Sequence, residues 1–158
     1  MLFFKWMGGF LLVFCGFLLG WMNVCYRRRQ RRQAEGFLTI LYRLRLQIDC
    51  FSTPIATVLE GLEDTLLSDC AVGARQADFS ALLANAELCL SPDACRLLYE
   101  FGERLGGGRR EEQLRCCDYY IARLTPYCDE LRKDLARREK TAFLLPILGS
   151  LAGVLLFL

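Results

Sequence analysis

The chain has 158 residues, which is enough for one domain, and a formal net charge of only +2 at neutral pH. So small a charge does not favour nucleic acid as a partner. Hydrophobic residues make up 54% of the sequence although 24% of it is charged, and every acidic residue lies between Glu35 and Glu139. The surplus of apolar residues therefore lies at the two ends, which indicates a soluble middle region between membrane segments.

The first predicted element is a transmembrane helix over residues 1–26. From Met7 to Cys25, Asn23 is the only strongly polar residue, and the arginines that follow are Arg27, Arg28, Arg29, Arg31 and Arg32. Basic residues beside a span stay on the cytoplasmic side, so we interpret this block as a topology signal instead of a nucleic-acid arm. Because the charge follows the apolar run, we expect an uncleaved anchor and not a signal peptide.

The middle region, residues 27–140, is predicted to be an all-α, antiparallel bundle of about five helices, because no segment alternates with the period of a strand. The first helix of the bundle is expected to bury Phe37, Leu41, Leu44, Ile48 and Phe51. Thr53 as a cap and Pro54 in the first helical position predict a second helix that reaches Ser68. Its apolar face is expected to comprise Ile55, Val58, Leu59, Leu62 and Leu66.

Two shorter helices are expected next. After a loop over residues 69–76, a third helix is predicted from Asp78 to Cys89, with Phe79, Leu82, Leu83 and Ala86 facing inward. Ser91 is then a typical helix cap before Pro92, and the fourth helix is expected to end at the three glycines 106–108. Its buried face is predicted to comprise Leu97, Leu98, Phe101 and Leu105.

The last helix is predicted to begin at Arg109 and to run into the membrane. Apolar residues recur at steps of three and four, a heptad pattern made by Leu114, Cys117, Ile121, Leu124, Cys128, Leu131 and Leu135. Pro126 interrupts this helix, so we expect a kink or a break there. Residues 141–158 are uncharged and follow Arg137, Arg138 and Lys140, which predicts a second transmembrane helix and a cytoplasmic middle domain; the alternative is a buried core helix with a hydrophobic end.

Each predicted span contains glycines four residues apart, a spacing that lets helices approach closely in lipid. These are Gly16 and Gly20 in the first span and Gly149 and Gly153 in the second. They are candidates for packing between the two spans or with another membrane protein. The sequence does not decide whether the chain forms a homo-oligomer.

Catalysis is not predicted. The chain has nine cysteines but no histidine, no C-x-x-C pair and no nucleotide-binding or hydrolase motif, so we expect no metal, no cofactor and no enzymatic activity. Cys116 and Cys117 suggest a thiol redox site, but adjacent helix residues point about 100° apart, too divergent for a bond. A redox protein is therefore the weakest alternative, behind a generic membrane-tethered adaptor or signalling module.

Several segments resemble the stage III sporulation protein AB family. They are Leu41–Ile48, Thr53–Ile55, Leu97–Gly106, Arg110–Gln113 and Gly149–Leu156, and the resemblance covers essentially the whole chain. Gly107, Gly108, Arg109, Pro126 and the many cysteines depart from the family pattern. The family is similar to the cytoplasmic helical domain of the inner-membrane platform protein of type II secretion and type IV pilus machines.

The resemblance implies a scaffold in the channel complex between mother cell and forespore. Such a protein would lie in the outer forespore membrane, face the mother cell, and meet a secretion-type ATPase and other membrane proteins of the stage III sporulation AA–AH complex. The glycine turn between the fourth and last helices is the candidate docking point. The residues expected to contribute are Glu103, Arg104, Arg109, Arg110 and Glu112; the alternative is a solvated turn with scattered charges.

Overall fold

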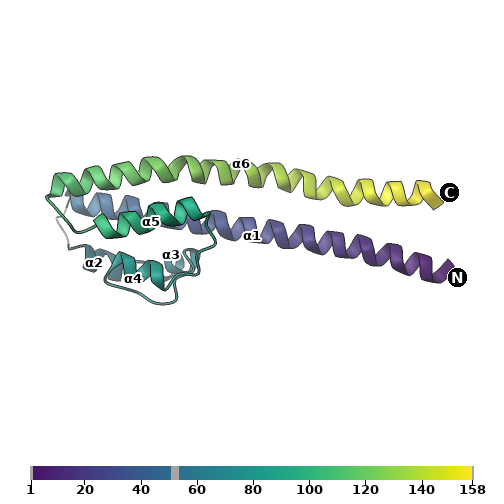
Figure 1. The fold of residues 1–158 in the computed structure, drawn as a ribbon, viewed down its shortest axis with the longest axis horizontal. Helices are drawn as coiled ribbons and strands as arrows, with labels where there is room; N and C mark the ends of the chain where they lie inside the picture. Colours follow the sequence, from purple (N-terminus) through teal and green to yellow (C-terminus); the bar gives the residue numbers. More distant parts are fainter. Residues whose placement is uncertain (1, 51–53, 158) are drawn as a thin grey trace. The chain divides into compact units, whose positions relative to one another are not determined.

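The computed structural model describes the backbone of residues 2–50 and 54–157, and the side chains of Phe14, Leu18, 20–50 and 54–137. The helices, shown in Figure 1, are α1 (Leu2–Cys50), α2 (Ile55–Glu60), α3 (Asp64–Asp69), α4 (Phe79–Ala84), α5 (Pro92–Arg104) and α6 (Arg110–Phe157). The described backbone contains no strand, and its isolated antiparallel bridge joins Val72 to Ala86. The all-α prediction is confirmed.

The chain divides into two compact units. We call Arg29–Leu131 the helical unit, and Met1–Arg28 together with Arg132–Leu158 the terminal unit. The helical unit falls inside the range predicted for the soluble bundle, residues 27–140. It contains α2 to α5 and one part each of α1 and α6.

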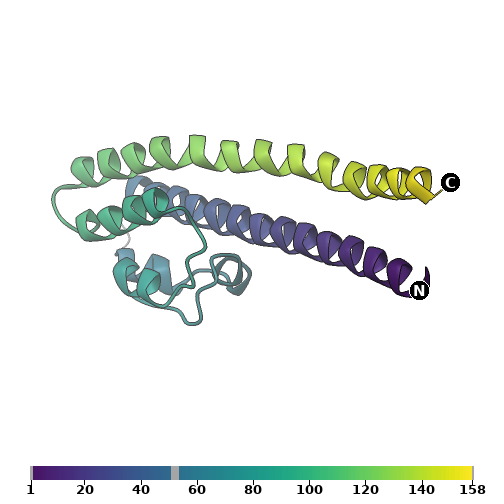
Figure 2. The ribbon, with the colours of Figure 1, turned by 45° about the vertical axis from the view of Figure 1, so that its right-hand side comes forward.

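Aromatic rings connect four helices through the core of the helical unit. Phe37 of α1 meets Phe79 of α4 edge to face, with ring centroids 6.5 Å apart. The ring of Phe79 also meets Phe101 of α5, with ring centroids 5.1 Å apart, and Phe101 meets Tyr120 of α6, with ring centroids 5.4 Å apart. Figures 1 and 2 show α5 between α4 and the first part of α6, so α5 is the central helix of this layer.

The predicted stripe on α1 is buried as expected. Phe37, Leu41 and Leu44 have no exposed surface and Ile48 is 5% exposed, while Phe51 lies outside the described residues. Ile40 is buried too, because the apolar face is wider than one heptad seam. Buried leucines, valines and isoleucines of this kind each contribute about 1.5–3 kcal/mol to folding.

The prediction of one helix from Pro54 to Ser68 is wrong. The segment forms α2 and α3, separated by Gly61, Leu62 and Glu63. Pro54 is the N-cap of α2 and not its first helical residue, and Thr53 lies outside the described residues. Glycine is about 1 kcal/mol less favourable than alanine inside a helix, and the break at Gly61 still leaves Leu59, Leu62 and Leu66 buried.

The third predicted helix is also shorter than expected. It ends at Ala84, where the side-chain amide of Asn85 donates to the carbonyl of Ala81 at 2.9 Å. Beyond Asn85 the chain is held by Gln33 of α1, whose amide nitrogen donates to the Glu87 carbonyl at 2.8 Å and whose oxygen accepts from the Cys89 amide at 2.7 Å. Pairing with this buried side chain replaces the hydrogen bonds of a longer helix.

The boundaries of α5 agree with the prediction. Ser91 caps it by accepting from the Ala94 amide at 3.3 Å, and Pro92 is its first residue. Leu98 and Phe101 are buried, whereas Leu97 and Leu105 are only partly buried.

Pro126 does not break α6, which is helical from Arg110 to Phe157. Proline lacks the amide hydrogen that would bond to the Ala122 carbonyl. Ala122 and Pro126 are both exposed, so water can reach that carbonyl. The seam residues on both sides of the proline, Leu124 and Cys128, remain buried.

The predicted transmembrane helices, 1–26 and 141–158, fall in the terminal unit and mostly outside the described side chains. Within the part of the chain that the structure describes, no helix has the length and apolar character needed to cross a membrane. Gly20 is exposed, and a Cβ added to it would meet no described atom within 4 Å. Gly16, Gly149 and Gly153 lie outside the described side chains, so the glycine packing sites stay a prediction.

Candidate partner-binding surface

The turn between α5 and α6 is built by glycine and capped by a carboxylate. Gly106 and Gly108 have φ angles of +88° and +86°, in the left-handed region that residues with a Cβ rarely adopt. The Glu112 carboxylate accepts from the backbone amide of Arg109 at 3.2 Å. This bond satisfies one of the free amides at the start of α6 and holds the turn against that helix.

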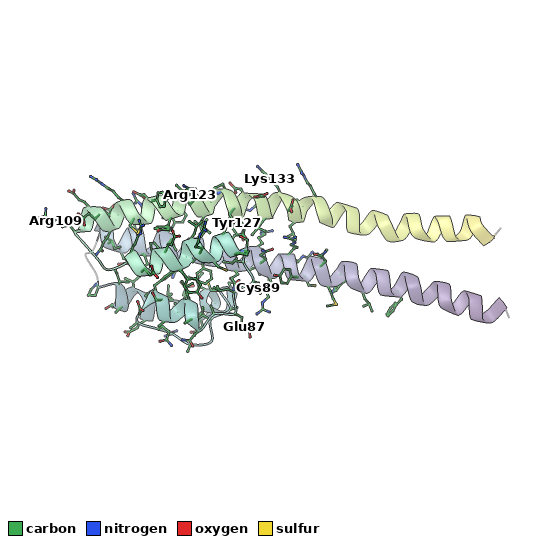
Figure 3. All side chains as sticks on the ribbon, in the orientation of Figure 1. Glu87, Cys89, Arg109, Arg123, Tyr127 and Lys133 are labelled. Atoms are coloured by element: carbon green, nitrogen blue, oxygen red, sulfur yellow. The ribbon has the colours of Figure 1, made fainter. Side chains whose placement is uncertain are left out.

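All five residues predicted for partner binding lie around this turn and are exposed. Glu103 and Arg104 end α5, whereas Arg109, Arg110 and Glu112 stand at the start of α6. Figure 3 shows Arg109 at the turn, with its side chain pointing away from the helices. The structure thus brings the five charges to one end of the helical unit, but it gives them different environments.

Arg110 is held by α1. Its guanidinium donates to the carbonyl of Ile48 at 3.1 Å, to the carbonyl of Asp49, and to the Asp49 carboxylate at 3.2 Å. The last carbonyls of a helix lack amide partners and carry the negative end of the helix dipole, so a cation there is stabilising. Arg110 therefore ties the end of α1 to the start of α6, a role that its sequence position does not reveal.

A shallow, open hollow of about 350 Å³ lies beside the turn. We call it the α5–α6 hollow; it is lined by Arg104, Gly107, Glu112, Arg115, Cys116, Tyr119 and Tyr120. Sequence reasoning did not identify Arg115, Tyr119 or Tyr120, since the heptad pattern places them off its seam. The signal for this site in the sequence is Tyr119, a large aromatic residue off the seam with Arg115 before it and Arg123 after it.

The rim and floor of the hollow differ in exposure. Tyr119 is 50% exposed, and the Arg123 guanidinium lies 5.5 Å from the centre of its ring. Tyr120 is 3% exposed and packs edge to face on Tyr119, with ring centroids 5.1 Å apart. Burial raises the pKa of Tyr120 and of the Cys116 thiol, and in each case the nearby charge of Arg104 opposes the effect.

Most arginines of the helical unit are matched to carboxylates. The pairs between different elements are Arg29 with Glu87, Arg43 with Glu63, Arg45 with Asp118, Arg75 with Asp64 and Arg110 with Asp49. By contrast, the side chains of Arg104 and Arg115 form no hydrogen bond or ion pair within residues 29–50 and 54–131. Two guanidinium groups without carboxylate partners therefore lie at the hollow.

Burial makes four of the described thiols less reactive. Burial raises the pKa of Cys70 to about 12 and that of Cys117 to about 12, and it raises the pKa values of Cys95 and Cys116 as well. Reactive thiols have lowered pKa values, because the thiolate is the nucleophile. Among the described residues, no cluster of three or more acidic or cysteine side chains could hold a metal ion.

A family model described as stage III sporulation protein AB matches residues 5–158. The chain belongs to this family. No curated protein and no solved structure matched it.

Membership gives the helical unit a biological setting. The stage III sporulation protein AB family is named for a step of endospore formation, so the chain has a role in sporulation. Its family name also associates it with the stage III sporulation complex. The described helices, from α1 to α6, are thus the fold of a stage III sporulation protein AB.

Proposed function

We propose that the protein is a membrane-anchored platform of the channel complex between mother cell and forespore, which docks a secretion-type ATPase through its helical unit. The protein would act as a scaffold and not as an enzyme. Family membership supports the place in sporulation. The observation that carries the docking proposal is the exposed, charged end of the helical unit around the α5–α6 turn.

The turn presents charged side chains at the end of two helices. Gly106 and Gly108 permit its left-handed path, and the hydrogen bond from the Arg109 amide to Glu112 joins it to the start of α6. Glu103, Arg104 and Arg109 are exposed there. Complementary charges at such a rim steer association and select the partner, which suits a docking role.

Exposed apolar residues on α1 support membrane anchoring. Phe14, Leu18, Trp21, Met22 and Tyr26 are between 44% and 67% exposed. Phe14, Leu18, Met22 and Tyr26 follow one another at steps of four, and Trp21 is adjacent to Met22, so the five lie along one side of the helix. A soluble surface rarely exposes so many large apolar side chains together. Tyr26 directly precedes Arg27, and Trp21 lies less than two helical turns before it. Aromatic residues close to a basic block are typical of a membrane interface, so we propose that this face contacts lipid and that the helical unit is cytoplasmic.

The test measures binding of the purified ATPase to the full chain in detergent micelles. Reversing one exposed charge of the turn with Arg109→Glu should weaken binding by roughly threefold to tenfold, with the larger loss at low salt. Arg75→Glu is the matched control, since Arg75 is also exposed but pairs with Asp64 away from the turn. The double variant with Arg110→Glu is unsuitable, because it would also release the end of α1.

Two results would contradict the proposal. If the wild-type chain does not bind the ATPase at any salt concentration, the platform function is wrong. If Arg109→Glu and Arg75→Glu bind equally well, the ATPase docks on another surface.

A further inference from the structure

The α5–α6 hollow is small and open to solvent. Its volume of about 350 Å³ is at the lower end of the range of ~300–1,000 Å³ for ligand pockets. Small-molecule sites enclose most of the ligand, whereas this hollow opens to solvent between the end of α5 and the start of α6. A site this shallow fits a few side chains presented by another protein.

The residues that line it are those that dominate protein interfaces. Tyrosine and arginine are strongly enriched among the residues that carry most of the binding energy. Tyr119 offers an exposed ring on top of the buried Tyr120, and Cys116 adds apolar surface to the same hollow. An aromatic or aliphatic side chain would gain contact area there with little rearrangement, because buried Tyr120 supports the ring of Tyr119.

The charges at the hollow specify the chemistry of the partner. Arg104 and Arg115 have no carboxylate partner in the described helical unit, although five other arginines of the unit are paired across elements. The lining contains one carboxylate, Glu112, which accepts from the Arg109 amide. Two guanidinium groups against one carboxylate leave the lining with a net positive charge, and guanidinium groups bind carboxylates through paired, charge-assisted hydrogen bonds.

We propose that the α5–α6 hollow binds a short acidic segment of a partner protein. The carboxylates of the segment pair with Arg104 and Arg115, and an apolar side chain between them lies on Tyr119 and Tyr120. The inference rests on the proposed docking function, to which it adds the chemistry of the docked segment. It also moves the centre of the docking surface from the turn itself to the adjoining faces of α5 and α6.

The rate at which the Cys116 thiol is alkylated reports whether the α5–α6 hollow is occupied. The probe is the peptide acetyl-Glu-Glu-Phe-Glu-Glu-amide, added to the full chain in detergent micelles, and alkylation of each thiol is followed by mass spectrometry. When a ligand covers a thiol, its alkylation slows by the factor 1 + [L]/Kd, so peptide at about three times its Kd should slow Cys116 about fourfold. Cys95 is the internal control, because it is also half-buried with a raised pKa but does not line the hollow.

Charge variants then test the contacts. Arg104→Glu combined with Arg115→Glu should weaken protection of Cys116 by roughly tenfold, since attraction becomes repulsion at two positions. Arg104→Gln combined with Arg115→Gln removes the charges without repulsion and should give a smaller loss. Arg75→Glu should leave protection unchanged, and circular dichroism of each variant monitors folding.

The outcomes separate this inference from the docking function. Equal protection by the peptide with lysine in place of glutamate, or no protection of Cys116, would overturn the acidic-segment proposal even if the ATPase binds. Protection by the acidic peptide without any ATPase binding would uphold the chemistry of the hollow and refute the ATPase as the partner. Slower alkylation of Cys95 to the same extent would show a nonspecific effect and refute the site.

Discussion

Gln33 is the residue on which the connection between α4 and α5 depends. It has no exposed surface, and it donates to the carbonyls of Cys70 and Glu87 and accepts from the amide of Cys89. A single side chain thus satisfies backbone groups in two segments that form no helix. The same side chain holds residues 87 and 89, which lie outside any helix.

Gln33→Leu should lower the free energy of unfolding by about 3 kcal/mol, because it leaves buried backbone groups without partners at about 1–3 kcal/mol each. Urea denaturation of the full chain in micelles measures the loss. Gln76→Leu is the matched control, since Gln76 is half-buried and makes no hydrogen bond to a described residue. A loss below about 1 kcal/mol for Gln33→Leu would mean that the connection does not need these bonds.

Ala71 is a second residue with a measurable effect. It has a φ of +55° and follows Cys70, the C-cap of α3. The amide of Ala71 donates to the Ser68 carbonyl and that of Val72 donates to the Leu67 carbonyl. These two bonds form a Schellman motif, whose left-handed position is usually glycine. Alanine is therefore strained there.

Ala71→Gly should raise the free energy of unfolding by about 0.5–1 kcal/mol, because relief of the left-handed strain exceeds the entropy that glycine adds to the unfolded chain. Thermal denaturation measures the gain, with Ala74→Gly in the neighbouring exposed loop as control. An unchanged or lower melting temperature for Ala71→Gly would show that the left-handed conformation is not populated in solution.

At the scale of elements, α6 continues through a proline at its exposed face. Pro126 removes one helical hydrogen bond, but Leu124, Cys128 and Leu131 stay buried on the opposite side. The Thr125 hydroxyl donates to the Ile121 carbonyl at 2.7 Å, one turn earlier. Burial of the seam thus outweighs the local preference against a helix.

Pro126→Ala should stabilise the protein by about 1–3 kcal/mol, since proline is about 3 kcal/mol less favourable than alanine in a helix interior but also restricts the unfolded chain. Urea denaturation gives the difference, and Ala122→Ser, one turn earlier on the exposed face, is the control. Destabilisation by Pro126→Ala would indicate that α6 needs the proline for its packing.

At the scale of the whole molecule, the proposed topology makes a prediction about access to thiols. A reporter cysteine is introduced by Ser68→Cys, at an exposed position of the helical unit, after the native cysteines outside the buried core have been replaced by serine. If the helical unit is cytoplasmic, the reporter should resist a membrane-impermeant maleimide in intact cells and react after lysis.

Ser91, another serine of the helical unit, is less suitable than Ser68 as the position of the reporter cysteine. The side chain of Ser91 caps α5, and its amide donates to the Tyr127 hydroxyl, which also accepts from Gln30. Figure 3 shows Tyr127 with Cys89 and Glu87 near this end of α5. Labelling of the Ser68→Cys reporter from outside intact cells would refute the topology.

The sequence alone determined the features that follow from local patterning. Period and capping residues predicted an all-α fold, the buried stripe of α1, the start of α5 at Pro92 and the charged turn between α5 and α6, because each depends on residues within a few helical turns. Similarity to the stage III sporulation protein AB family was also readable from the residues and is confirmed.

The tertiary structure decided the features that depend on residues distant in sequence. Gln33 shortens α4 through hydrogen bonds to residues 87 and 89. Leu62 and Leu66 are buried on the far side of the break at Gly61. Burial of the heptad seam allows α6 to continue past Pro126. The engagement of Arg110 by the end of α1, and the hollow between Arg104 and Arg115, likewise need the fold. The physical reason is that helix propensities differ by about 1 kcal/mol or less per ordinary residue, whereas burial of an apolar side chain and pairing of a buried polar group each contribute as much or more. These larger contributions come from residues far away in sequence, which a local pattern does not identify.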